Sequence, residues 1–392
     1  MGNTSSTYKG RLINHSKLLA EEFVLADEKT EGSTMYSPLS VSLILRLVYL
    51  ISSNNIKEIL EAVLSKSDAT GFLDRTNVGM DLNNFLSATE EDADMLRVLI
   101  GVFINEALRV DTPFDTMLVA KKIHCKIRYL NTKTDAAMEN SLAQANNYVA
   151  RKTQGQIQNI LLTENLTKNT NTLLINTVYF RANWHEVKFI ELRKQNFHGG
   201  AQKSAVMMIS RPVALHTYKD AHYNCVKVPY QGGFSLHIFV QRISTLTDSS
   251  AITGASLLET EKVQFKLEEY MSKLSSGAKT LVELHLPKFE LDTTLDISDW
   301  FVKQGCGQLF TDEVTLPKLD VNENLKITKI IHSSRISINE GRNFIETPSL
   351  SGTSAEKDSK DNKVTTVNCN RPFYYAITNY DGIIIFNGIY RN

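Results

Sequence analysis

The sequence lacks an excess of charge of either sign. Its 392 residues include 43 lysines and arginines and 43 aspartates and glutamates, so the formal net charge is zero with histidine neutral. Proteins that bind nucleic acids through their phosphates depend on surplus positive charge. The balance therefore argues against a nucleic acid as the main partner, and leaves room only for a local basic patch.

Cysteine is scarce, and the four cysteines lie far apart. No two of them form a C-x-x-C pair, which excludes a zinc ribbon and a thioredoxin-like motif. Two disulfides are arithmetically allowed. However, 42% of the residues are hydrophobic, and a chain of this length can bury a large core without cross-links. We therefore expect buried free thiols at Cys125, Cys225, Cys306 and Cys369.

The sequence also lacks long apolar runs. The most apolar stretch, residues 39–51, contains Arg46 and is shorter than the roughly 18 residues that a transmembrane helix needs. Residues 1–22 have no apolar segment of the kind found in secretory signal peptides.

The first residues instead match a lipidation pattern. They read MGNTSS, which fits the M-G-x-x-x-[ST] pattern for N-myristoylation at Gly2. A single acyl chain provides only a weak membrane tether. The alternative interpretation is a flexible polar leader.

No motif for catalysis is found. The sequence has no G-x-S-x-G nucleophile elbow and no H-E-x-x-H zinc motif. The glycines before Lys203 and around Cys306 match neither the phosphate-binding nor the dinucleotide-binding spacing. We therefore expect no enzymatic activity, no metal and no cofactor.

Hydrophobic periodicity and turn residues predict an α+β fold, with helices mainly in the first half and strands in the second. The segment that starts at Ser37-Pro38 has the serine cap and early proline of a helix start. Helices are expected at residues 16–25, 37–51, 54–64, 142–159 and 295–303.

Strands are indicated by apolar runs and by turn residues between them. Residues 95–105 and 172–180 are nearly all apolar, which is typical of strands buried on both faces. Further extended segments are expected at residues 281–289 and 326–339. Hairpins are expected between 225–230 and 234–240, and between 371–379 and 383–390, because glycines lie in both turns.

A long polar segment, residues 341–368, separates two of these strands. A loop of this length inside a compact fold is typically functional or disordered. It is also the most protease-accessible stretch of the sequence.

Several short motifs, taken in order, resemble the serpin family over about residues 12–392. Residues 36–40 (YSPLS) resemble the opening of its helix B, and residues 146–157 its helix F signature. Residues 174–184 (LINTVYFRANW) are very similar to its L-x-N-A-x-Y-F-K-G-x-W motif. Further motifs follow in the family's order: VMM at 206–208, VPY at 228–230, LPKF at 286–289, IH at 331–332, RPF at 371–373 and FNGIY at 386–390.

The resemblance implies one domain of three β-sheets and about nine helices at residues 12–392, preceded by a flexible leader at residues 1–11. It implies a monomer whose reactive-centre loop is about residues 341–368. A target serine protease would cleave this loop and form an acyl-enzyme. The cut loop would then insert into the central sheet and distort the trapped protease.

By the same resemblance, a polar cluster beneath the central sheet gates the insertion. The matching residues are Ser37, Ser40, Asn176 and His332. The alternative is a purely structural role, in which these four polar groups are hydrogen-bonded in the core and hold a helix to the sheet.

The hinge, which is the part of the loop that inserts first, departs from the family's pattern. The family has small residues there, because an inserting strand must bury alternate side chains without overpacking. This sequence has no alanine at the corresponding positions, and His332 lies one residue closer to Gly341 than the family's spacing. The hinge comprises Glu340, Gly341, Arg342, Asn343, Phe344, Ile345, Glu346, Thr347 and Pro348.

The register of insertion decides which hinge side chains become buried. If Gly341 matches the family's glycine, the buried set is Arg342, Phe344, Glu346 and Pro348, and burying unpaired charges is unfavourable. A shift by one residue buries Asn343, Ile345, Thr347 and Ser349 instead. A non-inhibitory serpin that acts as a binding, carrier or chaperone-like protein therefore remains the alternative to an inhibitor.

Two ways of counting along the chain bound the position of the scissile bond. Counting forward from Gly341 places it near residues 355–356, and counting back from Pro372 places it near residues 361–362. Lys357 and Lys360 lie in this window and are the natural bait for a trypsin-like protease. The alternative is a solvated loop without a dedicated target. We expect a cytoplasmic protein or one secreted without a classical signal peptide, with membrane association through Gly2 as a variant.

Overall fold

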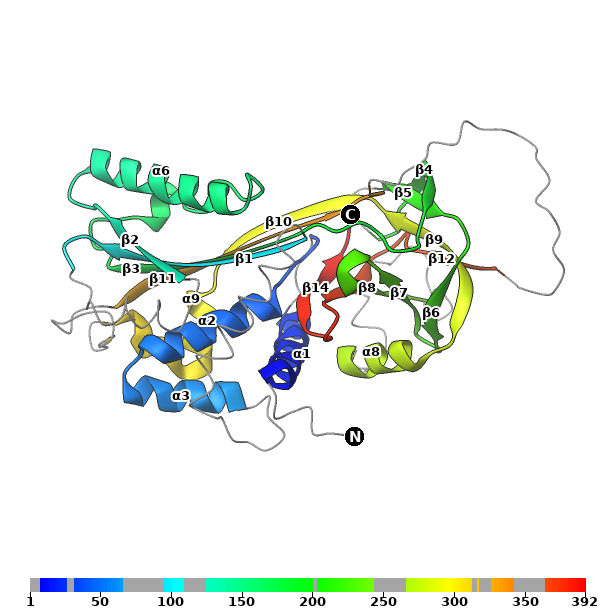
Figure 1. Cartoon of the computed structure of the whole chain (residues 1–392), viewed down its shortest axis with the longest axis horizontal. Coiled ribbons are helices and arrows are strands. Elements are labelled where there is room, and N and C mark those ends of the chain that lie inside the picture. Colours follow the sequence, from blue (N-terminus) through cyan, green and yellow to red (C-terminus); the bar gives the residue numbers. More distant parts are fainter. Residues whose placement is uncertain are drawn as a thin grey trace. The chain divides into compact units, whose positions relative to one another are not determined.

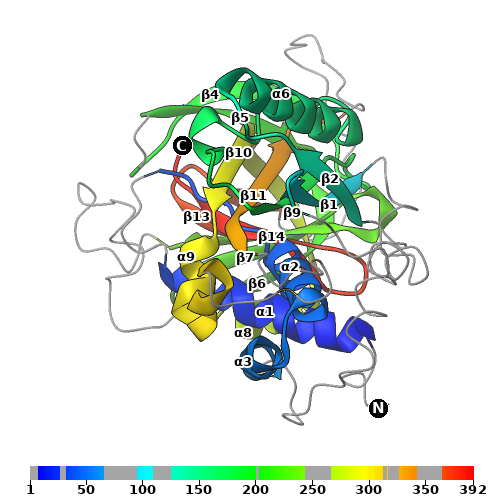
Figure 2. The ribbon, with the colours of Figure 1, turned by 90° about the vertical axis from the view of Figure 1, so that its left-hand side faces the viewer.

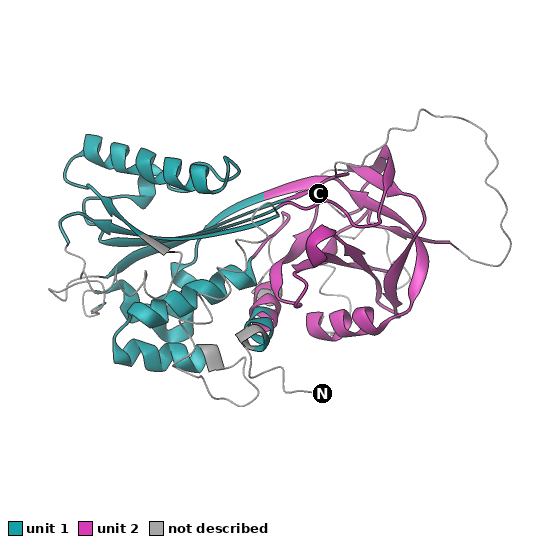
Figure 3. Ribbon diagram, viewed as in Figure 1, with its two compact units in different colours: residues 1–16, 37–180, 292–336 teal, residues 17–36, 181–291, 337–392 magenta. Residues whose placement is uncertain are grey.

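The computed structural model describes residues 8–26, 32–65, 95–108, 125–199, 203–242, 266–311, 316, 326–341 and 364–392. The chain divides into two compact units, each assembled from three separate stretches (Figure 3). Unit 1 comprises Met1–Ser16, Ser37–Phe180 and Asp292–Ile336, and unit 2 comprises Lys17–Tyr36, Arg181–Leu291 and Ser337–Asn392. Because these stretches alternate along the chain, neither unit is a contiguous segment.

A five-stranded sheet forms the centre of unit 1. Its order is β10 (Phe289–Asp296), β11 (Ile327–Ile338), β3 (Thr172–Phe180), β1 (Leu96–Asn105) and β2 (Cys125–Leu130). Strand β3 is antiparallel to β1 but parallel to β11, and β1 is parallel to β2. All nine residues of β3 are buried, as expected for a strand covered on both faces.

Helices cover both faces of this sheet (Figures 1 and 2). Helix α6 (Asp135–Lys152) lies across one face, and α2 (Pro38–Ile51), α3 (Asn54–Ser65) and α9 (Ser298–Phe301) lie on the other. Tyr148 and Val149 of α6 pack in one apolar cluster with Phe103 of β1, Ile175 of β3 and Ile331 of β11. Every residue of α2 is buried.

Unit 2 is built on a nine-stranded sheet. The order is β14 (Ile384–Tyr390), β13 (Phe373–Thr378), β8 (Ser235–Gln241), β7 (Tyr223–Pro229), β6 (Val213–Lys219), β9 (Lys279–Pro287), β5 (Ser204–Ser210) and β4 (Phe189–Asn196), with β12 (Thr365–Asn368) paired to β9. Helix α8 (Leu267–Ser276) contributes Leu267, Tyr270 and Leu274 to an apolar cluster that includes Phe239 and Tyr374.

The predicted α+β class is confirmed. The described residues contain six α-helices and two hydrogen-bonded sheets, where the resemblance implied about nine helices and three sheets for the whole chain. Strand β9 accounts for the difference in sheets. It pairs with β6, β5 and β12, and so connects strands that would otherwise belong to separate sheets.

Three predicted helix starts were wrong, and the helix expected at residues 142–159 ends at Lys152. Helix α1 (Tyr8–Ala26) begins eight residues before the predicted start, so residues 8–11 of the expected leader are helical. Helix α6 begins at Asp135, where the Thr134 side chain accepts a hydrogen bond from the Ala137 amide, and not at residue 142. Helix α9 begins at Ser298, because β10 continues to Asp296. The first turn of α6 includes Ala136, Ala137 and Met138, but Glu139 and Asn140 follow, so the apolar period begins clearly only at Leu142.

The predicted strands and turns are largely confirmed. Gly232, Gly233 and Gly382 have φ values of 72°, 77° and 89°, in the left-handed region that tight turns require. Residues 281–289 form parts of two strands, since Lys288 separates β9 from β10. Strands β2, β4, β5, β6 and β12 and helix α8 were not predicted, and of β10 only Phe289 lies in a predicted strand.

The buried thiols are confirmed where the side chains are described. Cys225, Cys306 and Cys369 are free and buried. Burial raises the pKa of Cys306 to about 11, so this thiol is uncharged at neutral pH. The side chain of Cys125 lies outside the described part. Among the helices that the structure describes, none has the length and apolarity to cross a bilayer.

Candidate functional site

The candidate site begins at the parallel pair of β3 and β11, which we call the seam. The register places Asn176 opposite His332 and Thr177 opposite Ser333, and all four residues are buried. Beyond the seam, β11 ends at Ile338 and the described chain continues to Gly341. The seam therefore leads directly into the predicted hinge.

A polar cluster lies under the seam. The hydroxyl of Ser40, in α2, donates to Asn176 Oδ1 in β3. The same oxygen lies 3.2 Å from His332 Nδ1 in β11. His332 Nε2 lies 2.7 Å from the hydroxyl of Ser334. These four residues, which we call the seam cluster, connect a helix to both strands of the seam.

The contacts fix the protonation of His332. An amide oxygen only accepts hydrogen bonds, so His332 must carry its proton on Nδ1, and Nε2 then accepts from Ser334. Burial lowers the pKa of His332 to about 4, which keeps the ring neutral at neutral pH. A neutral ring matches a cluster that contains no carboxylate.

Asn176 does not use all of its hydrogen-bonding capacity. Among the described residues, its Nδ2 has no acceptor, and neither does the buried hydroxyl of Thr177 next to it. A buried polar group without a partner costs roughly 1–3 kcal/mol. The middle of the seam is therefore less stable than a fully apolar strand pair would be.

Ser37 has a different role from the other predicted residues. It is the N-cap of α2, and its hydroxyl accepts a hydrogen bond from the Ser40 amide at 3.3 Å. Pro38 follows in the first turn, where a missing amide proton has no cost. Ser37 thus fixes the start of the helix that positions Ser40 under Asn176.

The structure therefore brings Ser40, Asn176 and His332 together as the resemblance implied. Ser334 was missed, although its position two residues after His332 on one strand places both side chains on the same face. The pairing of Asn176 with His332 spans 156 residues, and only the family resemblance related these two positions.

A second group of residues, which we call the loop anchor, holds the end of β11. The indole Nε1 of Trp184 donates to the Asn339 carbonyl at 2.7 Å. Lys288 Nζ donates to Glu340 Oε1 at 3.0 Å and lies 2.9 Å from Oε2. The Gly341 amide donates to Asn339 Oδ1 at 2.9 Å. Trp184 also stacks on Tyr230 with ring centroids 4.2 Å apart.

The charge of Glu340 is maintained by its neighbours. Partial burial raises the pKa of this carboxyl. A backbone hydrogen bond and Lys288 together lower it by more, so the pKa lies below its ordinary value. Side-chain exposures of 43% for Lys288 and 20% for Glu340 leave the pair open to solvent. Such a pair contributes at most about 1 kcal/mol. This ion pair is therefore a weak part of the loop anchor.

Gly341 lies three residues after the end of β11 and is the last described residue before residue 342. Its φ is +76°, and a Cβ atom added there would lie 3.3 Å from Trp184 Cδ1. Both the backbone conformation and the adjacent indole therefore favour glycine. Trp184 and Lys288 were not predicted as site residues, although both lie within the motifs that carry the family resemblance.

The remaining predicted site residues lie outside the described part of the chain. These are Gly2, Arg342, Asn343, Phe344, Ile345, Glu346, Thr347, Pro348, Lys357 and Lys360. The description resumes at Val364, and Thr365–Asn368 form β12, parallel to β9. The last four residues of the predicted loop thus belong to a strand.

Comparison with known proteins gives consistent matches over nearly the whole chain. A family profile described as "Serpin (serine protease inhibitor)" matches residues 21–392. Serpin B3 of Homo sapiens is 23% identical over 401 residues, covering 95% of this chain and 97% of that protein. The plasma serine protease inhibitor of Homo sapiens is 24% identical over 331 residues, covering 81% of this chain and 74% of that protein.

The fold also matches solved structures. A structure described as a tumour suppressing serpin has a TM-score of 0.78 at 18% sequence identity, and the match covers 98% of this chain and 100% of that one. At this identity, the match shows a shared fold.

Proposed function

The chain belongs to the serpin family, whose profile matches residues 21–392, and on this premise we propose that it inhibits a serine endopeptidase as a suicide substrate. The observation that carries the proposal is the connection between the seam and the loop. Strand β11 pairs in parallel with β3 and leads through Gly341 into residues 342–363, and the chain is held again by β12. A cut in this loop would release one end while β11 holds the other.

The chemical step belongs to the protease. Its serine oxygen attacks the carbonyl carbon of a loop residue, the peptide bond breaks, and the new amino group leaves with the C-terminal part of the loop. The N-terminal part remains joined to the protease as an ester. No residue of the inhibitor needs to supply a proton or a nucleophile.

Insertion would use the geometry of the seam. After Gly341 the cut loop would turn back and run antiparallel to β11, and hence antiparallel to β3. One parallel pairing would be replaced by two antiparallel pairings, which are slightly more stable per residue. The uncut protein would then be a kinetically trapped state.

The end of β11 bears on the register of insertion. Ile336 and Ile338 are buried, whereas Arg335 and Ser337 are partly exposed. Paired residues of an antiparallel hairpin lie on the same face of the sheet. A turn with an even number of residues pairs the buried Ile338 with an odd-numbered loop residue, and therefore buries the set that includes Asn343 and Ile345. An odd number buries the set with the charged side chains.

We infer the first register. Two-residue turns are the commonest hairpin connections, and they use the left-handed conformation that Gly341 already has. The buried set is then Asn343, Ile345, Thr347 and Ser349, which contains no charge. Pro348 still lacks an amide proton for one hydrogen bond, and this lowers the efficiency of insertion without preventing it.

We propose Lys357 or Lys360 as the bait residue and a trypsin-like protease as the target. The support is the position of both lysines in the window for the scissile bond, and the preference of trypsin-like specificity pockets for basic side chains.

The test is incubation with trypsin followed by denaturing gel electrophoresis. We expect a covalent complex that survives SDS, and mass spectrometry should place the cut after Lys357 or Lys360. Replacing the bait, Lys357→Ala or Lys360→Ala, should abolish the complex, whereas Lys363→Ala serves as a control of equal charge in the same loop. A cut loop without any complex would contradict inhibition and would favour the non-inhibitory alternative.

We also propose that Gly2 is myristoylated and that the protein acts as a monomer. The support for lipidation is the MGNTSS pattern. Intact-mass measurement of the protein from its native source would show the acyl group, and light scattering would give a mass near 44.1 kDa for a monomer. An unmodified N-terminus or a multiple of this mass would contradict the respective proposal.

A further inference from the structure

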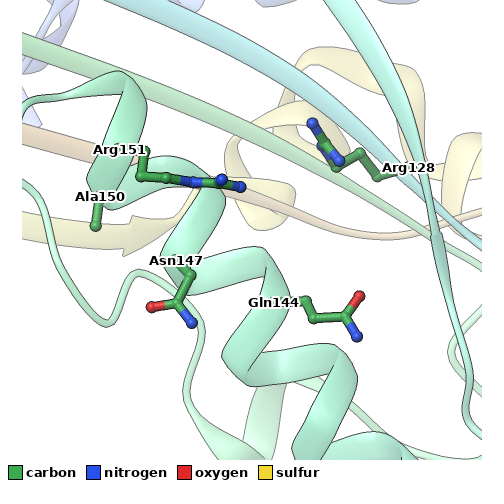
Figure 4. A pocket seen from close by; sticks show the side chains of 5 residues that line it. All are labelled: Arg128, Gln144, Asn147, Ala150 and Arg151. Atoms are coloured by element: carbon green, nitrogen blue, oxygen red, sulfur yellow. The ribbon is translucent and has the colours of Figure 1, made fainter.

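Unit 1 contains a polar cavity between α6 and β2 (Figure 4). Its volume is about 450 Å³, and it is lined by Arg128, Gln144, Asn147, Ala150 and Arg151. A second cavity of about 230 Å³ shares Arg128 and Gln144 with the first, so the two are neighbours. Neither lining includes an aspartate or a glutamate.

The cavity results from the way two elements present their side chains. Gln144, Asn147 and Arg151 are three and four residues apart on α6 and therefore lie on one face of this helix. Side chains of a helix lean toward its N-terminus. Figure 4 shows Arg151 extending from α6 toward Arg128, which comes from β2.

Arg128 is oriented by stacking. Its guanidinium carbon lies 3.9 Å from the centre of the Tyr148 ring, so the face of the guanidinium is covered and its N–H edge is directed elsewhere. Its buried Nε has no acceptor among the described residues. A buried donor without a partner is unfavourable unless a ligand supplies the acceptor.

No carboxylate neutralises the two arginines within the part of the chain that the structure describes. The ion pairs found there involve neither Arg128 nor Arg151. Two guanidinium groups and two side-chain amides therefore line a cavity that holds no compensating negative charge.

We propose that this cavity is a phosphate-binding site that takes the phosphate group of a small organic phosphate between Arg128 and Arg151. A phosphate monoester carries up to about two negative charges at neutral pH, which two guanidinium groups balance. Planar guanidinium groups bind phosphate oxygens in a bidentate manner, and the amide groups of Gln144 and Asn147 add donors. The volume lies in the range of small-molecule sites and exceeds the need of a bare phosphate ion.

Binding would join α6 to the edge of the sheet. Arg128 comes from the edge strand β2, and Arg151 comes from the last turn of α6. The same helix packs on β1, β3 and β11 through Tyr148 and Val149. A bound phosphate would therefore stabilise unit 1 and hold α6 on the sheet, independently of whether the chain inhibits a protease.

The test uses the full chain and two probes, glycerol 3-phosphate and inorganic phosphate, in isothermal titration calorimetry and thermal unfolding. Glycerol and sodium chloride at matched ionic strength are the ligand controls. We expect saturable binding of glycerol 3-phosphate at one site, weaker binding of inorganic phosphate, and a rise in the unfolding temperature that neither control produces.

Variants locate the site. Arg151→Gln should weaken binding by about tenfold or more, because it removes a charge-assisted bidentate contact. Arg151→Lys should recover only part of the affinity, since lysine cannot bind in a bidentate manner. Lys152→Gln, the same change of charge one residue along α6, should leave the affinity unchanged. Arg151 is exposed, so these variants are expected to fold.

Three results would overturn the proposal. The first is the absence of saturable binding of both probes. The second is equal weakening by Arg151→Gln and Lys152→Gln, which would indicate a general charge effect. The third is equal affinity for inorganic phosphate and the monoester, which would refute the assignment of an organic phosphate.

Discussion

The side chain of Asn176 contacts hydrogen-bonding groups of two other elements, a helix and a neighbouring strand. Its oxygen accepts from Ser40 of α2 and contacts His332 of β11, while its backbone belongs to β3. Such a position is sensitive to the charge of its neighbours. A protonated His332 would place a cation in a cluster without a carboxylate, and this gives the seam cluster a dependence on pH.

The first prediction concerns this dependence. His332 has a pKa of about 4 in the fold and an ordinary value of 6.5 when unfolded. The unfolded chain therefore binds an additional proton between these values. The contribution of His332 to stability is complete above about pH 6.5 and is lost as the pH falls toward 4, to an extent of roughly 3 kcal/mol.

Urea unfolding at pH 7 and at pH 4.5 measures this effect. His332→Gln keeps a neutral side chain, so its stability should fall less between the two pH values than that of the wild type. His185→Gln, at an exposed histidine, should follow the wild type. Identical pH dependence in wild type and His332→Gln would contradict the prediction.

The second prediction separates backbone strain from crowding at Gly341. Gly341 and Gly382 both have positive φ, but only Gly341 has a neighbour, Trp184, within 4 Å of an added Cβ. Gly382→Ala should cost about 1 kcal/mol from the backbone alone. Gly341→Ala should cost more, because Trp184 or the chain must also move. An equal loss of unfolding free energy in the two variants would show that Trp184 moves aside without a measurable cost.

At the scale of elements, the seam differs from the strand pairing next to it. Its partners β3 and β11 are parallel and buried, whereas the neighbouring pair of β1 and β3 is antiparallel. The proposed function requires the first pair to separate and the second to remain. A cross-link placed in one pair at a time tests which pair must separate.

The third prediction uses such cross-links. Thr177 and Ser333 are register partners across the seam, so a disulfide in the variant Thr177→Cys/Ser333→Cys should prevent insertion. The oxidised variant should be cleaved by trypsin without forming a complex, and reduction should restore the complex. Val98→Cys/Val178→Cys cross-links β1 to β3 and should leave complex formation unchanged. A complex formed by the oxidised seam variant would show that the seam need not open.

The elements also show how far the sequence predicts the structure. Strands with nearly continuous apolar runs, such as β1 and β3, were located to within a residue because burial on both faces leaves a clear signal. Strand β4 was missed, since most of its residues are at least partly exposed and carry no clean alternation. Helix α8 has apolar residues at Leu267, Tyr270 and Leu274, a helical spacing that was overlooked.

The sites were less predictable than the elements. The loop anchor depends on Trp184, Lys288 and Glu340, which come from distant parts of the sequence and meet only in the fold. The cavity at Arg128 and Arg151 depends on how α6 lies against β2. No local sequence pattern shows which distant residues come together in the fold. Composition and periodicity alone could therefore not have indicated either site.

At the scale of the molecule, cleavage of the loop should change the stability of the whole chain. An inserted strand of about ten residues adds on the order of ten backbone hydrogen bonds, each worth about 1 kcal/mol. For a chain of this length, we expect the unfolding temperature to rise by roughly 10 °C.

Calorimetry before and after limited proteolysis checks this fourth prediction. The cut protein should unfold at the higher temperature, and the oxidised Thr177→Cys/Ser333→Cys variant should show no rise when its loop is cut. An unchanged unfolding temperature in the cut wild type would indicate that the loop stays outside the sheet, as in a non-inhibitory protein.

The alternation of the two units along the chain has a consequence for synthesis on the ribosome. The last stretch of unit 1 ends at Ile336, whereas unit 2 still lacks β12, β13 and β14 at that point. The side chain of Asn387 donates to the Ala20 carbonyl, a contact between residues 367 positions apart. Unit 2 can therefore be completed only near the end of translation. The strands of the seam, in contrast, both leave the ribosome before residues 342–363 do, so a nascent chain can close its central sheet while the segment that would compete for that place is still inside the exit tunnel.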